Sequence, residues 1–566
     1  MIRISEIKLP LDHDAATLHN AAAAALGTAP EAIARLHIHK RSFDARKQDL
    51  RAVYIVDATM AEPDGVAGLL QKHEAHPHIG PSPDMAWHPP AGAPFEAPVR
   101  PVVIGFGPCG IFAALVLAQL GLKPIVLERG RSVRQRTQDT WGLWRRKELL
   151  PESNVQFGEG GAGTFSDGKL YSQIKDPRHL GRKVMQEFVA AGAPPEILVD
   201  ARPHIGTFKL VKVVENIRAQ IVAMGGEIRF EHKVTDLHIE DGGPKGRRLR
   251  GLTVLDQASG ISHEMRADHV VLALGHSARD TFTMLWRRGV FIEAKPFSIG
   301  FRVEHPQGVI DRARWGRHAG HPMLGAADYK LVHHASNGRA VYSFCMCPGG
   351  TVVAATSEVG RVVTNGMSQY SRNERNANAG IVVGIDPSDF PTDYQHLDLP
   401  GEAQGKPHPL AGMEMQRRLE SNAYVLGGSD YQAPGQLVGD FVAGTPSTQL
   451  GEVEPSYKPG VLLGDLHQAL PAYAIEAMRE AFPAFGRKIP GFNRHDAVLT
   501  GVETRTSSPV KITRGDDYQS LNLSGLYPAG EGASYAGGIL SAGVDGIKVA
   551  EALAQQVCAS GGLRGF

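Results

Sequence analysis

The hydrophobic pattern of the first seventy residues predicts a small α+β domain. Apolar and polar residues alternate over residues 2–9, as in a half-buried strand, and residues 15–26 form an alanine-rich helical stretch. Residues 35–43 and 51–56 flank a polar turn, as the two strands of a hairpin do. We place this N-terminal domain at residues 1–72.

A proline-rich segment follows this domain. Eight prolines stand between residues 73 and 101. Because proline removes a backbone donor, we expect neither a helix nor a central strand there. We therefore interpret residues 73–99 as a linker.

From residue 102 the pattern becomes that of a βαβ unit. Residues 102–105 are a short apolar strand, a glycine-rich turn follows, residues 111–120 are an apolar helix, and residues 124–128 are the next strand. Two further helices are predicted at residues 472–482 and 540–556.

The turn of this unit has the G-x-G-x-x-G spacing of a dinucleotide site, with Glu128 at the end of the following strand. Gly105 permits the tight turn, Gly107 lets the backbone approach a pyrophosphate, and Gly110 allows the helix to pack closely on the strand. Unpaired N–H groups at the helix N-terminus face the phosphate charge. Glu128 is expected to accept hydrogen bonds from a ribose diol, and because it repels a ribose phosphate, the phosphorylated nicotinamide cofactor is disfavoured. FAD and NAD both satisfy this site.

Three remote segments favour FAD, which is longer and needs further contacts. Residues 158–168 contain five glycines, which leave backbone N–H groups free to face a ligand. Residues 227–275 have the pattern of short antiparallel strands, a β-meander, followed by an apolar strand. Residues 525–532 are a strand that ends in Gly-Glu, and the glycines at 537–538 open the last helix, where an N-terminus stabilises negative charge on a reduced flavin.

Composition and charge narrow the function further. The 566 residues include 60 Lys and Arg against 59 Asp and Glu, a formal charge of +1, which argues against a broad nucleic-acid surface because phosphate binding needs surplus cations. The four cysteines include no C-x-x-C pair, so no metal site is predicted and a reducing compartment, the cytoplasm, is expected. The longest apolar run, residues 111–122, is too short to span a bilayer.

Together these motifs resemble those of the FAD-binding flavoprotein superfamily of the glutathione-reductase type, in the branch with a single dinucleotide fold. The blocks GGAGTFSDGKL at 160–170, SFCMCPGG at 343–350 and GGILSAGVDG at 537–546 are similar to those of bacterial FAD-dependent oxidoreductases labelled NAD(FAD)-utilising dehydrogenases. The chain departs from the family at 530–531, where Gly-Glu replaces the usual Gly-Asp. The resemblance implies FAD as the cofactor, held by Gly105, Gly107, Pro108, Cys109, Gly110, Glu128, Arg129, Gly160, Gly161, Ala162, Thr164, Val234, Gly275, Gly530, Glu531, Gly538 and Ile539.

Two cysteines are candidates for redox chemistry. At strand spacing Cys345 and Cys347 point to the same face with Met346 opposite, and Pro348 and the two glycines after it are expected to turn the chain toward another strand at residues 351–357. Thiols beside a flavin can exchange electrons with it, and Cys347 is our catalytic candidate. The alternative is that both are small apolar core residues.

Three further side chains are candidates for catalysis. His276 follows an apolar strand, and ligands bind at the C-terminal ends of parallel strands, so it is a candidate acid or hydrogen-bond donor to the cofactor; the alternative is a loop histidine that caps a turn. Glu503 and Arg505 stand just before the terminal FAD segment, where the arginine is expected to bind an anionic substrate. The alternative is an ordinary ion pair.

We predict an α/β fold with a Rossmann-like FAD-binding domain and β-meander at residues 100–280 and 501–566, an inserted β-rich α+β substrate domain at 281–500, and the small N-terminal α+β domain. The predicted function is that of an FAD-dependent oxidoreductase moving hydride between flavin and a small-molecule substrate. No second dinucleotide turn follows a strand, so NADH or NADPH is expected only as a transient reductant. Two alternatives stay open: a flavoprotein that acts on or binds RNA, and a non-catalytic flavin-dependent interaction protein.

Overall fold

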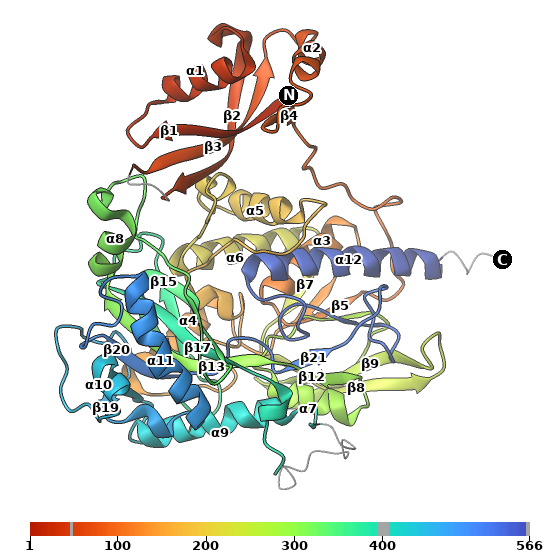
Figure 1. The fold of residues 1–566 in the computed structure, drawn as a ribbon. Coiled ribbons are helices and arrows are strands. Elements are labelled where there is room, and N and C mark those ends of the chain that lie inside the picture. The colour runs from red at the N-terminus through yellow and green to blue at the C-terminus, as the bar shows by residue number, and fades with distance from the viewer. Residues whose placement is uncertain (46–48, 394–406, 562–566) are drawn as a thin grey trace.

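The N-terminal part of the chain folds as a four-stranded antiparallel sheet with order β2-β3-β1-β4 and two helices (Figure 1). The computed structural model describes residues 1–45, 49–393 and 407–561. The elements of this domain are β1 (Ile2–Pro10), α1 (Ala15–Leu26), a 3₁₀ turn (Pro30–Ala32), β2 (Ile33–Asp44), β3 (Arg51–Met60), α2 (Gly65–Lys72) and β4 (Ile79–Pro81).

The alternating pattern of β1 fixes which face of this sheet is buried. Ile2, Ile4 and Ile7 are buried against α1, which begins after Asp14, whose side chain accepts from Thr17 N at 2.7 Å. The domain runs to residue 81 and not to 72, because β4 pairs with β1 inside the segment interpreted as a linker. The many prolines of this segment are compatible with β4 because it is an edge strand, in which a missing backbone N–H removes no hydrogen bond between inner strands.

A five-stranded parallel sheet of order β22-β11-β5-β6-β7 forms the centre of the molecule. Distant segments lie side by side in it, because β11 pairs with both β5 and β22. The strands are short and almost wholly apolar, as expected for a sheet covered on both faces. They are β5 (Val102–Ile104), β6 (Ile125–Leu127), β7 (Glu227–Arg229), β11 (Val270–Leu272) and β22 (Leu526–Pro528).

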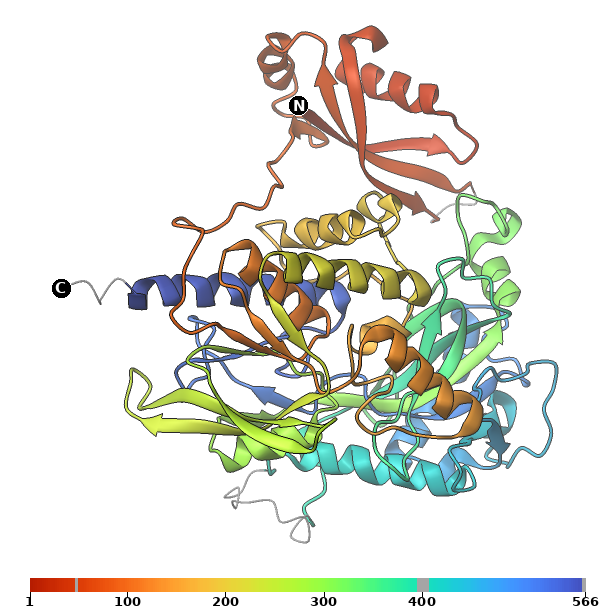
Figure 2. The same cartoon turned by 180° about the vertical axis from the view of Figure 1, so that it is seen from behind.

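Helices cover one face of the parallel sheet and a small antiparallel sheet covers the other (Figures 1 and 2). The helical layer is α3 (Pro108–Gln119), α5 (Leu180–Ala190), α6 (Thr207–Ala223) and α12 (Ile539–Gly561). The opposite layer is the predicted meander, β8 (His232–Asp241), β9 (Arg247–Asp256) and β10 (Ile261–Arg266), with α7 (Arg279–Arg287) beside it. Helix α4 (Val133–Arg146) and 3₁₀ turns at Ala162–Phe165 and Pro195–Leu198 complete this body. Helix α3 begins three residues earlier than predicted because Pro108 occupies its first turn.

The inserted domain is built on a larger, mostly antiparallel sheet of order β14-β15-β17-β13-β20-β18-β19, with β16 paired to β15. Its strands are β13 (Phe297–Pro306), β14 (Val332–His334), β15 (Ala340–Ala354), β16 (Thr364–Ser368), β17 (Asn376–Ile385), β18 (Ala433–Leu437), β19 (Val461–Leu463) and β20 (Val498–Glu503). Its helices are α8 (Gln307–Trp315), α9 (Ala411–Leu426), α10 (Val438–Ala443) and α11 (Ala472–Lys488), with 3₁₀ turns at Gly316–His318, Pro387–Asp389 and Leu466–Gln468. Because β20 pairs with β13 and β18, the inserted sheet extends past the boundary predicted at residue 500.

The chain passes between these two bodies at a short antiparallel pair, β12 (Ile292–Ala294) and β21 (Val510–Ile512). The N-terminal domain projects from these two bodies in both views (Figures 1 and 2). It contacts both of them: Arg41 N donates to the carbonyl oxygen of Val199 at 2.7 Å, and the side chains of Asp12 and His321 meet at 3.0 Å. None of the described helices combines the length and the apolar character that crossing a bilayer requires.

Candidate functional site

One cavity of about 860 Å³ is lined both by the parallel-sheet body and by the inserted domain. One wall is the glycine-rich turn between β5 and α3. A Cβ on Gly110 would lie 1.9 Å from the carbonyl oxygen of Gly105, so the helix packs directly on the turn, as its predicted role requires. Gly107, the N-cap of α3, faces the cavity with no side-chain cap, and its Cβ would meet only Gly161 Cα at 3.5 Å. The backbone of the helix N-terminus is therefore open to a ligand.

The predicted ribose ligand, Glu128, is buried at the end of β6 and lines the cavity. Its Oε2 accepts from Phe106 N at 2.8 Å, and its Oε1 accepts from Gly130 N and Gly158 N at 2.8 and 2.9 Å. Three backbone donors thus fix the carboxylate. Because Oε2 has one protein donor, it keeps lone-pair capacity for a ribose hydroxyl.

Arg129 also lines the cavity, but its guanidinium is committed to other side chains. It donates to both oxygens of Glu152 at 2.7 and 3.0 Å and to both oxygens of Asp280 at 2.8 and 3.0 Å, and it stacks over Phe157. Burial opposes charge on Asp280, but Arg129 holds the pKa of that carboxyl well below its usual range. Arg129 therefore stabilises the cavity wall through these ion pairs, and only the aliphatic part of its side chain is available to a ligand.

The glycine-rich loop forms the next part of the wall. A Cβ on Gly161 would lie 2.8 Å from Gly107 Cα, so the loop and the dinucleotide turn abut. Gly161, Ala162, Ser166 and Lys169 face the cavity. Thr164 does not face the cavity, because its hydroxyl is buried, without a hydrogen-bond partner among the described residues. That hydroxyl packs against Gly160: a Cβ added to Gly160 would lie 2.1 Å from it.

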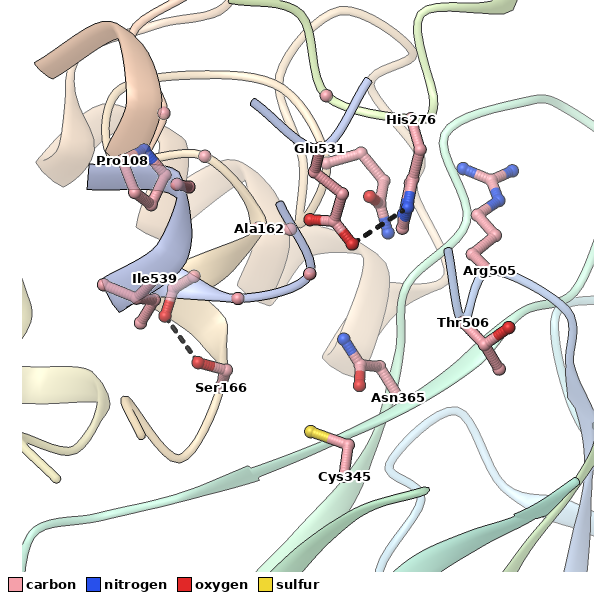
Figure 3. Close-up of a pocket in the computed structure, with 18 of the residues that line it drawn as sticks. Pro108, Ala162, Ser166, His276, Cys345, Asn365, Arg505, Thr506, Glu531 and Ile539 are labelled. Carbon is pink, nitrogen blue, oxygen red and sulfur yellow. Dashed lines mark hydrogen bonds and ion pairs between the residues drawn. The ribbon is translucent and has the colours of Figure 1, made fainter. Parts of the chain in front are cut away.

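The opposite end of this wall is the start of α12. The glycines at 537–538 and Ile539 face the cavity, so a second helix N-terminus borders it. Glu531, after β22, and His276, after β11, approach each other with Oε1 and Nδ1 3.4 Å apart (Figure 3). The predicted position of His276 at the C-terminal end of a parallel strand therefore brings it into the cavity.

The inserted domain supplies the floor of the cavity. Figure 3 shows Cys345, Asn365, Arg505 and Thr506 on this side, facing the start of α12 and the Glu531–His276 pair. Asn365 Oδ1 accepts from Arg302 Nη2 at 3.3 Å, which leaves the amide N–H groups of Asn365 on the cavity side. The floor therefore presents a thiol and an amide donor.

Glu503 and Arg505 line the cavity as predicted, and each takes part in a buried ion pair. Glu503 accepts from Arg302 Nε and Nη2 at 2.9 and 3.0 Å, and burial still raises the pKa of Glu503 despite that cation. Arg505 donates to Glu420 at 3.1 and 3.0 Å, and burial lowers the pKa of Arg505. Arg505 shares Glu420 with Arg279 and also donates from Nη1 to the hydroxyls of Ser277 and Ser357 at 3.0 and 2.7 Å, so most of its donors are engaged. Binding of an anion by Arg505 stays a prediction.

The pairing of Cys345 and Cys347 on one strand face is also wrong. Strand β15 runs unbroken from Ala340 to Ala354 through the predicted turn at Pro348, but it contains an extra residue between Phe344 and Cys347. This bulge, with Cys345 at φ +42°, ends the regular alternation. Cys345 lines the cavity and Cys347 is fully buried beneath it, so Cys347 does not reach the site that we assigned to it.

Most of the predicted cofactor contacts lie in the cavity wall. They are Gly105, Gly107, Pro108, Cys109, Glu128, Arg129, Gly161, Ala162, Val234, Gly275, Glu531, Gly538 and Ile539. Gly110, Gly160, Thr164 and Gly530 lie behind that wall. Gly530, for example, packs on Cys109, because a Cβ added to Gly530 would lie 2.8 Å from the Cβ of Cys109. These four support the cradle without lining it.

Several lining residues were not predicted from the sequence. They include Gln156, Ser166, Lys169, Tyr171, Tyr329, Tyr342, Asn365 and Thr506. Lys169 and Ser166 lie in the glycine-rich loop, so the block itself pointed to them. Asn365, on β16, carried no sequence signal.

The donor set fits a flavin dinucleotide. The N-terminus of α3 would hold the pyrophosphate, Glu128 the adenosine ribose, and the N-terminus of α12 the flavin end. A Cβ at either Gly107 or Gly161 would point at the other glycine, so these two segments meet without a side chain between them where both border the cavity.

Comparison with known proteins agrees with this cradle. Residues 296–506 match the family model "FAD-dependent protein, C-terminal domain-like", and residues 1–59 match "Domain of unknown function (DUF8436)". An uncharacterized protein of Clostridium beijerinckii is 46% identical over 97% of this chain and 98% of its own length. The chain belongs to the same family as this clostridial protein. For this family member, the FAD-dependent model together with the cavity identifies FAD as the cofactor.

Solved structures of flavoproteins are more distant. Glycerol-3-phosphate dehydrogenase from Bacillus halodurans, complexed with FAD, is 11% identical with a TM-score of 0.34, over 82% of this chain and 65% of that one. A flavoprotein/dehydrogenase from Cytophaga hutchinsonii is 13% identical with a TM-score of 0.35, over 81% of this chain and 79% of that one. At these TM-scores the likenesses carry nothing about the reaction.

Proposed function

We propose that this protein is an FAD-dependent dehydrogenase or reductase that moves hydride between flavin and a small molecule held on the floor of the inserted domain. One observation carries the proposal: a single cavity is bordered by two helix N-termini, by the Glu128 carboxylate, and by polar groups of a second domain. Bound FAD supplies a centre that accepts or donates hydride.

The chain's own residues orient and enclose a substrate at this floor. Arg302 holds the Asn365 side chain through Oδ1, so the amide nitrogen is placed to donate to a substrate carbonyl or hydroxyl. Arg302 is itself fixed by Asn378 Oδ1 at 2.8 Å and by Glu503. Because these partners are buried, the donor keeps one orientation, which favours a single substrate pose.

A proton can be held next to the cavity by the Glu531–His276 pair. Glu531 Oε1 lies 3.4 Å from His276 Nδ1, so Nδ1 is the ring nitrogen that faces the carboxylate. His276 is then able to give or take a proton as substrate charge changes. Aromatic and apolar side chains, among them Tyr342, Phe344 and Met346, border the same space and limit water.

The test is to purify the full chain, release and identify the flavin, and follow anaerobic bleaching with NADH, NADPH and a metabolite mixture. We expect one FAD per chain and bleaching by at least one donor. A matched control is Asn365→Ala, which should keep FAD but weaken substrate-dependent bleaching, because it removes a floor donor outside the dinucleotide cradle. A colourless protein that cannot be reconstituted with FAD would overturn the proposal.

A further inference from the structure

The bulge in β15 brings two sulfur atoms together at the cavity floor. Cys345 lines the cavity, and Figure 3 shows its sulfur pointing into it. Cys347 lies directly below, fully buried, and its thiol donates to the carbonyl oxygen of Cys345 at 3.4 Å. One thiol therefore faces the ligand space while a second stands behind it, which is the arrangement of an attacking and a resolving cysteine.

Two cations approach these sulfurs from different elements. Lys169, in the glycine-rich loop, donates to the carbonyl oxygen of Met346. Arg302, on β13, is fully buried and donates from Nη1 to the carbonyl oxygen of Cys345 at 3.0 Å. Both charges favour the thiolate over the thiol.

The acidic groups nearby are already paired. Asp167, in the same loop as Lys169, is bound by Arg372, with Nε to Oδ1 at 2.9 Å. Glu503 is bound by Arg302. Contact with the Cys347 thiol, followed by Lys169 and Arg302, holds the pKa of Cys345 below that of an ordinary thiol although burial opposes it. The same contact together with burial raises the pKa of Cys347.

We propose that Cys345 and Cys347 form a redox-active dithiol, and that the substrate of this flavin site is a low-molecular-weight disulfide. The proposal names a substrate class for the proposed oxidoreductase and so rests on that function. It explains why a cavity without a C-x-x-C motif carries a thiol at its floor with a second thiol in contact.

The exchange balances in two steps. The Cys345 thiolate attacks one sulfur of R–S–S–R, a Cys345–S–S–R bond forms, and the first R–S⁻ leaves. Cys347 then loses its proton and attacks the Cys345 sulfur, so that a Cys345–Cys347 disulfide forms and the second R–S⁻ leaves. In sum, two protein thiols lose two electrons and two protons, and R–S–S–R becomes two R–SH. Reduced flavin, supplied by the proposed function, is the two-electron donor that restores the dithiol.

The test uses the full chain in a Cys558→Ser background, because Cys558 is exposed while Cys109 is buried. The probe is 4,4′-dithiodipyridine, which releases a coloured thiopyridone at each exchange. The Cys558→Ser protein should release two equivalents rapidly, and its peptide with Cys345 and Cys347 should be lighter by two hydrogens. Adding Cys347→Ser should stop the reaction at one equivalent, with a pyridylthio adduct on Cys345. Adding Cys345→Ser should abolish the rapid phase.

The pH dependence gives a second readout. The rate of alkylation of Cys345 by iodoacetamide should have its midpoint well below about pH 8.5, the value of an ordinary thiol. Lys169→Met should move that midpoint upward, an effect that a merely structural lysine does not have.

The outcomes separate this inference from the function on which it rests. Thiol exchange needs no flavin, so a colourless protein that still forms the internal disulfide would refute the proposed oxidoreductase and leave the dithiol. Two results obtained with FAD-loaded protein would overturn the dithiol. One is a Cys345→Ser variant that releases thiopyridone as fast as its parent. The other is a parent protein in which Cys345 and Cys347 end as two separate adducts.

Discussion

Gly107 and Gly110 belong to one turn, yet the structure predicts opposite consequences for replacing each with alanine. Gly107 has φ −79° and ψ −175°, which alanine adopts freely, and the nearest heavy atom to its Cβ is Gly161 Cα at 3.5 Å, an ordinary contact. Gly107→Ala should therefore cost the apoprotein only about 0.5–1 kcal/mol, the cost of an N-cap alanine. Its methyl group, however, would stand between the dinucleotide turn and Gly161 of the glycine-rich loop, beside the α3 N-terminus where we expect the pyrophosphate.

The expected loss for FAD binding follows from that position. If the methyl group prevents one charge-assisted hydrogen bond between the α3 N-terminus and phosphate, binding weakens by about 1.5–3 kcal/mol. This corresponds to roughly a 10- to 150-fold rise in the dissociation constant of FAD.

Gly110→Ala is the matched control. Its Cβ would lie 1.9 Å from the carbonyl oxygen of Gly105, a backbone atom that cannot move without shifting the turn. Such overpacking costs about 1–3 kcal/mol. At 2–4 °C for each kcal/mol, the apoprotein should melt about 2–12 °C lower.

The assay measures the two quantities separately: thermal melting of flavin-free protein, and FAD affinity from the quenching of flavin fluorescence. We expect Gly107→Ala to melt close to wild type and bind FAD poorly, while Gly110→Ala melts early. If Gly107→Ala binds FAD as tightly as wild type, the pyrophosphate does not lie at this turn and the reasoning fails.

Three further predictions follow. Glu420→Gln leaves Arg505 buried without its carboxylate and leaves Arg279 with Glu358 alone, so the free energy of unfolding in urea should fall by about 3–5 kcal/mol; an unchanged unfolding midpoint would contradict it. Burial disfavours the charged form of Glu420, but Arg279 and Arg505 hold its pKa below the ordinary value of about 4.3. The stabilisation that this carboxylate gives the folded protein is therefore present above that pH and is lost as the pH falls through the lowered pKa. Acid should lower the melting temperature of wild type more than that of Glu420→Gln. Deleting residues 1–81, which have a hydrophobic core of their own, should leave FAD content and turnover unchanged; loss of a co-purifying partner with unchanged flavin would instead favour the interaction-protein alternative.

The dinucleotide half of the site was predictable because its signals are local. The apolar strand, the glycine turn, the buried helix and Glu128 fall within residues 102–128, so the hydrophobic period and the glycine spacing alone assemble them. The N-terminal hairpin and α1 were found for the same reason. The edge strand β4 was missed because proline content was weighed without the sheet partner, β1, that holds it.

The floor of the cavity was not predictable because its geometry depends on distant pairs. Glu503 and Arg302 are 201 residues apart, and no local pattern marks them as partners. The period of two placed Cys345 and Cys347 on one face, but the bulge that separates them is set by how β15 pairs with β17. Motif reading therefore found residues near the flavin site but not the buried pairings that fix their positions.

The buried charges near the floor act on geometry more than on stability. Arg279 comes from α7 of the FAD-binding body, whereas Glu420 comes from α9 and Arg505 follows β20 of the inserted domain. Arg279 reaches Glu420 at 2.6 Å and Arg505 reaches it at 3.0 Å. Burying three charges costs desolvation that their attraction only partly repays. Apolar side chains would join the two bodies as strongly but without directional bonds, so this cluster is best understood as setting the angle at which the inserted domain presents Cys345 and Asn365 to the flavin.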